Sequence, residues 1–283
     1  MNPRFLVIDG YHQSGREELL AGAASTAGDL YTRMLEKCRP GCQIDVIFPA
    51  DPDVTLPGDS ELRDYDGIAW TGSSLTVYDD DRSVTSQIEL AKAAFTARIP
   101  SFGSCWAAQI AVVAAGGRCA RNPRGREMGI ARKIWLTAEG RAHPMFTGKP
   151  SVFDAFISHE DEITHLPASG MTLASNAFSQ VQAVTVTHRG GVFWAVQYHP
   201  EYDLHELARL THCRTQKLIH QGFFANTDAV ADYVEKLETL HRNPDRRDIA
   251  WQLGIDSDVM SEDIRLVEVR NWVNLQVLPG MWG

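Results

Sequence analysis

The segment IPSFGSCWAAQ (residues 99–109) decides the fold, because it joins a β-type apolar stretch to a helical one through a glycine-flanked cysteine. We predict a strand over 99–103, a sharp turn at Cys105 and a helix over 105–115. The amino end of this helix places partial positive charge beside the sulfur, which favours the thiolate. The turn lifts the side chain out of the end of the sheet. Cys105 is therefore predicted to be a nucleophile.

Strands alternate with helices on the amino-terminal side of this segment. The predicted strands are residues 4–10, 43–48 and 65–70, and the predicted helices lie within 16–37 and over 84–98. This alternation is typical of a parallel sheet covered on both faces. Sites in such sheets form at the carboxyl ends of the strands, where Cys105 and a turn at 71–74 both fall.

The pattern changes after residue 130. Short β-like runs between about 130 and 200, with a hairpin turn at 187–192, predict antiparallel strands that extend or flank the sheet. A helix over 204–222 is predicted to pack back on the core. We assign residues 1–225 to one α/β domain and residues 226–283 to a helical C-terminal extension. That extension either covers the core or forms a dimer or partner interface.

Within this extension, two longer helices are expected. Thr227 or Asp228 is predicted to cap a helix that runs to about His241. Ser261 is predicted to cap a last helix over about 262–275.

Composition excludes several classes of protein. The chain has 283 residues, of which 44% are hydrophobic and 22% charged, as in a soluble globular protein. Its net charge of −9 argues against nucleic acid or an anionic membrane as a partner. No apolar run is long enough to span a bilayer, and the amino end reads as a buried strand instead of a signal peptide. We therefore expect a cytoplasmic protein.

Cysteine usage is consistent with a reducing compartment. The five cysteines form an odd set without a dense framework. Cys38 and Cys42 are not spaced as CxxC and have no second Cys or His pair nearby with zinc-like spacing. We predict no metal site and no cofactor.

A second segment, WAVQYHPE (residues 194–201), supplies His199 and Glu201 at another predicted strand end. Histidine is suited to take a proton from a thiol and return one to a leaving amine. A carboxylate two residues away would orient the imidazole and stabilise imidazolium. The alternatives are an inert buried cysteine, a capping histidine and a solvated carboxylate. The occurrence of the turn and the His/Glu pair in one chain favours a triad of Cys105, His199 and Glu201.

These motifs, in this order, resemble the class I (triad) glutamine amidotransferase family. The resemblance rests on Gly103-x-Cys105-x-x-x-Gln109, Gly116-Gly117 and residues 197–201, together with TGSSLTV (71–77) and SHEDEI (158–163). It covers about residues 4–202 and is strongest to the glutaminase domain of GMP synthetases and their free-standing relatives. It implies a mostly parallel, flavodoxin-like sheet and hydrolysis of the γ-amide of glutamine through a γ-glutamyl thioester on cysteine.

The same resemblance assigns further residues. The backbone N–H groups of Ser73 and Trp106 would form the oxyanion hole. Ser73 replaces a family glycine, which is the cheaper residue if the donor needs a positive φ. Substrate contacts would come from four residues, namely Gly72, Gln109, Ser158 and His159. Ala107 also stands where the family usually has glycine, and its methyl group is expected to narrow or reshape the substrate pocket. Residues 122–129 are interpreted as a structural polar loop that borders the site.

Three functions are weighed. The first is a glutamine amidotransferase or glutaminase that passes ammonia to an unknown acceptor. No acceptor domain is visible, so this reading implies a subunit awaiting a synthetase partner or a free-standing member, with a homodimer as a further option. The second is a γ-glutamyl peptidase or hydrolase acting on the amide of another amine. The third is a non-catalytic relative, which the joint presence of Cys105, His199 and Glu201 disfavours.

Overall fold

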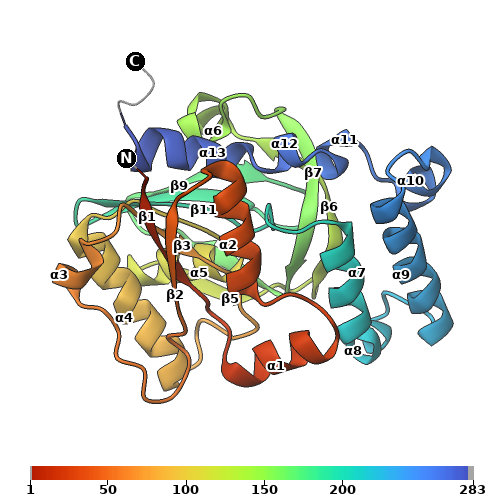
Figure 1. Cartoon of the computed structure of the whole chain (residues 1–283), viewed down its shortest axis with the longest axis horizontal. Helices are drawn as coiled ribbons and strands as arrows, with labels where there is room; N and C mark the ends of the chain where they lie inside the picture. Colours follow the sequence, from red (N-terminus) through yellow and green to blue (C-terminus); the bar gives the residue numbers. More distant parts are fainter. Residues whose placement is uncertain (1, 280–283) are drawn as a thin grey trace.

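The computed structural model describes residues 2–279, in which a nine-stranded sheet forms the centre (Figure 1). The strand order is β2-β1-β3-β4-β11-β10-β9-β6-β7. The first five strands are parallel, and the remaining four add on in antiparallel fashion. The strands of this sheet are β1 (Arg4–Ile8), β2 (Gln43–Ile47), β3 (Gly67–Trp70), β4 (Ser101–Ser104), β6 (Glu127–Leu136), β7 (Val152–His159), β9 (Gly170–Ser175), β10 (Ala183–His188) and β11 (Gly191–Val196). The predicted parallel sheet with an antiparallel extension is confirmed.

Helices cover both faces of the sheet. They are α1 (Gln13–Ala21), α2 (Ala27–Cys38), α3 (Asp59–Leu62), α4 (Arg82–Ala97), α5 (Trp106–Ala114), α6 (Ala138–Ala142), α7 (Leu204–Cys213), α8 (Thr215–His220), α9 (Thr227–Arg242), α10 (Arg247–Leu253), α11 (Ser257–Met260), α12 (Glu262–Arg265) and α13 (Val267–Trp272), with a 3₁₀ turn η1 (Pro144–Phe146) and a π-helical turn η2 (Val273–Val277). None of the helices in residues 2–279 has the length and apolarity needed to cross a membrane.

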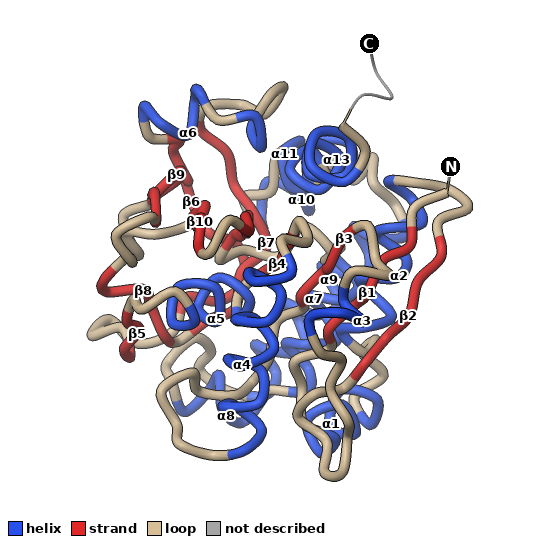
Figure 2. Tube along the Cα trace, turned by 90° about the vertical axis from the view of Figure 1, so that its left-hand side faces the viewer, coloured by secondary structure: helices blue, strands red, loops and turns tan. Residues whose placement is uncertain are grey.

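Alternation along the strands divides the core into two layers. Phe5 and Val7 of β1 face the layer that contains α2 and α13, whereas Leu6 and Ile8 face α4 and α5. This period-2 pattern is what a strand buried on both faces requires. A separate two-stranded sheet, β5 (Arg118–Arg121) with β8 (Asp161–His165), lies beside α5 (Figure 2).

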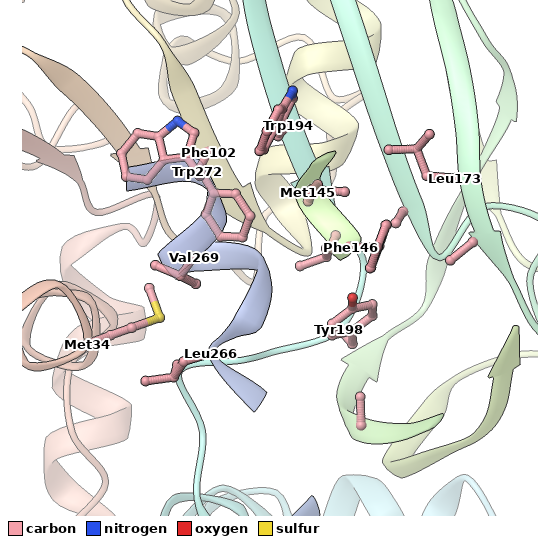
Figure 3. Packing of buried hydrophobic residues seen from close by; sticks show 14 of the residues in the cluster. Met34, Phe102, Met145, Phe146, Leu173, Trp194, Tyr198, Leu266, Val269 and Trp272 are labelled. Atoms are coloured by element: carbon pink, nitrogen blue, oxygen red, sulfur yellow. The ribbon is translucent and has the colours of Figure 1, made fainter. Parts of the chain in front are cut away.

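The helical extension packs on the rest of the chain. The Trp272 ring of α13 lies 5.6 Å from that of Phe5. It also lies 5.8 Å from the ring of Phe102 (Figure 3). Farther along, α9 packs against α7 (Figure 1). Much of the extension thus covers the core, as one of the two alternatives expected. Whether the boundary after residue 225 separates two folding units stays a prediction.

Several boundaries differ from the sequence prediction. The expected helix over 262–275 begins where predicted, with Ser261 at the N-cap position of α12, but it is not continuous. It is divided into α12, α13 and η2, and the Ser261 side chain makes no cap hydrogen bond. Asn226, one residue before the predicted caps, accepts from the amide of Ala229 and begins α9. The hairpin prediction is confirmed, with positive φ at Arg189 (49°) and Gly190 (86°).

Candidate active site

The cysteine turn between β4 and α5 has an unusual backbone. Cys105 has φ 54° and ψ −102°, a strained combination for a residue with a Cβ, and its N–H donates to the Val196 oxygen at 2.7 Å. The turn is tight enough that a Cβ at Gly103 would lie 2.3 Å from Cβ of Ala107. The sequence motif thus folds as the predicted strand–turn–helix. The expectation for Ala107 is wrong, because its methyl group faces Gly103 beneath the turn and does not line the cleft.

His199 follows β11 at the same edge of the sheet. Its Nδ1 lies 2.7 Å from Oε1 of Glu201, and its backbone N–H donates to Phe156. The hydroxyl of Ser104 donates to the same carboxylate oxygen at 2.9 Å and in turn accepts from Tyr31 at 2.7 Å. These contacts orient the imidazole so that Nε2 is the nitrogen available for chemistry.

The imidazole and the cysteine face each other across Gly72. A Cβ at Gly72 would lie 3.1 Å from Cε1 of His199 and 3.7 Å from Cβ of Cys105. Buried Nε2 of His199 has no hydrogen-bond partner within residues 2–279. Although burial opposes it, the Glu201 carboxylate and the Cys105 sulfur raise the pKa of His199 to about 9. The ring is also stacked on Tyr202, with centroids 4.1 Å apart.

Two backbone donors were predicted for the oxyanion hole, and both residues line the cleft beside Cys105. The N–H of Trp106 begins α5 and therefore has no intrahelical acceptor. Ser73 does not have a positive φ, so its backbone is unstrained in this conformation. Its hydroxyl donates to the Gly10 oxygen at 2.8 Å and accepts from the amide of Leu75. The serine that replaces the family glycine thus anchors this loop to the end of β1.

The predicted substrate residues fall into two groups. Gln109 and Ser158 line the cleft, and the Ser158 oxygen lies 3.7 Å from the Cys105 sulfur. The ring of His159 is held on both sides, by the Asp161 oxygen at 2.8 Å and by Glu127 at 3.0 Å. Gly72 lies between the imidazole and Cys105 and does not line the cleft. The ring of His159 is fully buried.

Among the cleft residues that sequence reasoning missed, two contact Ser158. Arg126 belongs to the segment interpreted as a structural loop, and Arg214 lies between α7 and α8. Both reach the hydroxyl of Ser158, at 3.5 Å and 2.7 Å respectively. The Arg-Gly-Arg pattern at 124–126 was the only local signal for the first. Nothing near residue 214 marks the second, since it reaches the site from a helix junction.

The cleft is large for an active site that handles one small amide. Its volume is about 910 Å³, and its walls come from the loops after β1, β3, β4 and β7 and from the α7–α8 junction. In the part of the chain that the structure describes, no cluster of three or more His, Cys, Asp or Glu is arranged to hold a metal ion.

Comparison with known proteins identifies the family. The family model described as "Glutamine amidotransferase class-I" matches residues 27–211, more than half of the chain. A γ-glutamyl-L-1-hydroxyisopropylamide hydrolase from a Pseudomonas species is 31% identical, over 98% of this chain and 94% of its own length. γ-Glutamyl peptidase 3 of Arabidopsis thaliana is 26% identical over 71% of this chain and 76% of its own.

Among solved structures, a glutamine amidotransferase from Thermotoga maritima superposes with a TM-score of 0.67. The alignment covers 98% of this chain and 99% of that one, including the helical extension, at 14% sequence identity. At this identity the likeness shows a shared fold. The predicted flavodoxin-like architecture is thereby confirmed.

Proposed function

Because the chain belongs to the class I glutamine amidotransferase family, we propose that it is a hydrolase that cleaves a γ-glutamyl amide with Cys105 as nucleophile. The observation that carries the proposal is the buried His199 beside Cys105, whose second nitrogen is held by Glu201. A thiol, a base and an orienting carboxylate together make an activated nucleophile.

The steps follow from the positions of these groups. Sγ of Cys105 attacks the amide carbon while Nε2 of His199 holds the thiol proton. The carbonyl oxygen gains negative charge and accepts hydrogen bonds from the amides of Trp106 and Ser73. The intermediate collapses as the C–N bond breaks and His199 gives the proton to the departing nitrogen. A γ-glutamyl thioester and a free amine result.

Water completes the cycle. His199 takes a proton from water as its oxygen attacks the thioester carbon, and the C–S bond breaks. The sulfur leaves as thiolate beside the imidazolium of His199, which restores the starting state, and glutamate is released. The net reaction consumes one amide and one water and yields glutamate and one amine. Glu201 stabilises the imidazolium formed in both halves.

Two observations favour an amine larger than ammonia. The cleft of about 910 Å³ exceeds what glutamine alone would fill. The Pseudomonas relative, similar along nearly the whole chain, is named for a γ-glutamyl amide of an amino alcohol. Glutamine hydrolysis remains the second candidate, supported by the family and by Gln109 in the cleft wall.

The test is incubation with γ-glutamyl-1-hydroxyisopropylamide and with glutamine, followed by amine release and peptide mass mapping. We expect one glutamyl group on Cys105 and faster turnover of the amino-alcohol amide. The Cys105→Ala variant should lose both signals.

Cys213→Ala is the matched control, because Cys213 lines the same cleft while burial raises the pKa of its thiol. This variant should keep the adduct. An adduct at Cys213 instead, or turnover by Cys105→Ala, would contradict the proposal. Faster turnover of glutamine would favour the second candidate.

A further inference from the structure

Two arginines converge on one hydroxyl in the wall of the cleft. Arg214 donates to Oγ of Ser158 at 2.7 Å, and Arg126 approaches the same atom at 3.5 Å. The carbonyl of Ser158 lies 3.7 Å from the Cys105 sulfur, so both guanidinium groups belong to the surroundings of the nucleophile. Arg126 also donates to Gln221 at 3.2 Å and to Glu160 at 2.8 Å, so Arg214 is the member of the pair with more N–H groups left for another acceptor.

Positive charge gathers in this part of the cleft, although the chain has a net charge of −9. The charged and titratable groups that line it are Glu18, Cys105, Arg121, Arg126, His159, Glu160, Asp161, His199, His212, Cys213, Arg214, Lys217 and the three tyrosines 11, 78 and 202. Glu160 is paired with Arg121, Arg126 and, at 4.0 Å, Lys217. Although burial opposes it, these cations lower the pKa of Glu160.

Arg214 differs from these basic residues because it has no carboxylate partner in the described part of the chain. Across residues 2–279, no carboxylate lies within 4.0 Å of its guanidinium, whereas the other three arginine and lysine side chains share Glu160. Burial and the charge of Arg214 lower the pKa of Arg126, as two like charges held near one hydroxyl require. A bound anion would relieve this repulsion and accept charge-assisted hydrogen bonds from both groups.

The position of Arg214 indicates which half of the substrate the anion belongs to. Tyr202 stacks on His199, and its neighbours include Tyr11 and Arg214. Arg214 therefore lies on the imidazole side, where the amine departs. Gln109 also lines the cleft, with its amide 3.4 Å from the Asp161 oxygen.

We propose that Arg214 and Arg126 bind a carboxylate carried by the amine half of the substrate, so that γ-glutamyl amino acids or peptides are preferred. This proposal rests on the proposed function, since it names the amine released by the same thioester chemistry. A guanidinium fork matches a carboxylate with two parallel hydrogen bonds, which a hydroxyl cannot reproduce. Tyr11 lies beside Arg214 in the cleft wall and would border the bound carboxylate.

A pair of matched substrates tests the proposal. γ-Glutamyl-alanine and γ-glutamyl-1-hydroxyisopropylamide share one carbon skeleton and differ only in a carboxylate against a hydroxymethyl group. We expect wild-type kcat/KM to be higher for γ-glutamyl-alanine. In Arg214→Gln the ratio of the two kcat/KM values should fall roughly 10- to 100-fold, as for the loss of a charged hydrogen bond. Arg126→Gln should lower it less, because this side chain is already paired with Glu160.

Lys217→Gln is the matched control, since it removes one positive charge from the same cleft without contact to Ser158. An equal fall of the ratio in Lys217→Gln would overturn the assignment to the arginine pair in favour of net charge. An equal loss for both substrates and for glutamine in Arg214→Gln would place the arginine on the glutamyl carboxylate and also overturn it. A ratio of the two kcat/KM values that is unchanged in Arg214→Gln would likewise overturn the proposal.

Failure of the proposed function has a different signature. If the wild-type chain releases no amine from any of the three amides, both proposals fall together. If it turns over the hydroxyl amide and glutamine through Cys105 and the ratio does not respond to Arg214→Gln, only the carboxylate site falls.

Discussion

Two buried histidine–glutamate pairs lie among residues 2–279, and they differ in how many of the ring nitrogens are hydrogen-bonded. His159 is bonded through both ring nitrogens, to the Asp161 oxygen and to Glu127, and Glu127 also accepts from Asn176 and Gln182. His199 is bonded through Nδ1 alone, and its buried Nε2 lacks a partner among residues 2–279. A pair in which both ring nitrogens are hydrogen-bonded holds β6 and β7 together and is structural. A pair in which one ring nitrogen beside a thiol is without a hydrogen bond has a nitrogen available for proton transfer.

The hydrogen bonding of the second ring nitrogen distinguishes a structural histidine from a catalytic candidate in this fold. His199 follows the central strand β11, whereas His159 ends the edge strand β7, and both histidines were candidates from sequence. Leaving a buried nitrogen without a partner costs free energy, so it persists where the rest of the fold compensates. If this distinction holds, changes at His199 should affect catalysis and changes at His159 should affect stability.

The largest expected effect is on catalysis. His199→Gln removes the group that moves protons, so kcat should fall about 10²- to 10⁴-fold. The measurement is amine release from the γ-glutamyl amide turned over by the wild type, with thermal unfolding recorded to confirm that the variant is folded. Retention of more than a tenth of wild-type kcat would show that another group takes the proton.

The same substitution at the saturated pair should act on stability. His159→Gln loses at least one buried hydrogen bond to Glu127 or Asp161, which costs about 1–3 kcal/mol of unfolding free energy. Its effect on kcat should be far smaller than that of His199→Gln. Urea unfolding and the same amine assay check both statements. If the two variants lose activity alike, the distinction between the pairs is wrong.

The smallest expected effect is on the pH profile. The folded chain holds the His199 proton up to a pKa of about 9, against an ordinary value of 6.5. The contribution of this proton to the folding stability is full below about pH 6.5 and is lost as the pH rises through 9. The same imidazolium donates the proton to the departing amine, so we expect kcat/KM to fall on the alkaline side near pH 9.

Glu201→Gln should move that alkaline limb to lower pH by a unit or more, because the carboxylate is the main group that raises the pKa of His199. The residual activity of the variant across pH 6–10 gives the measurement. An alkaline limb at the same pH in the variant would mean that a different group titrates there.

Local patterns were enough to predict the strand–turn–helix at Cys105, the hairpin after His188 and the parallel half of the sheet. They were not enough for the last helices or for β5 and β8. Ser261 does precede α12 as its N-cap, but the helix is interrupted at Leu266 before α13 packs Trp272 against Phe5. No glycine or proline marks that interruption in the sequence, so local spacing did not predict it.

For the candidate site, the chain order alone predicted Cys105, His199 and Glu201, because each stands in a local motif that follows a strand. The arginines could not be found in this way. Arg214 comes from a helix junction and meets Ser158, 56 residues earlier in the chain, only after α7 has packed on the sheet. Its role depends on distances that no local pattern encodes.

By itself, then, the amino-acid sequence determined the alternation of strands and helices and the chemical types of the reacting groups, since both are written in short-range spacing. The tertiary structure alone decided which histidine keeps an open nitrogen and which cations share the cleft. Hydrogen-bond saturation and charge proximity are properties of neighbours in space, and most of those neighbours are distant in sequence.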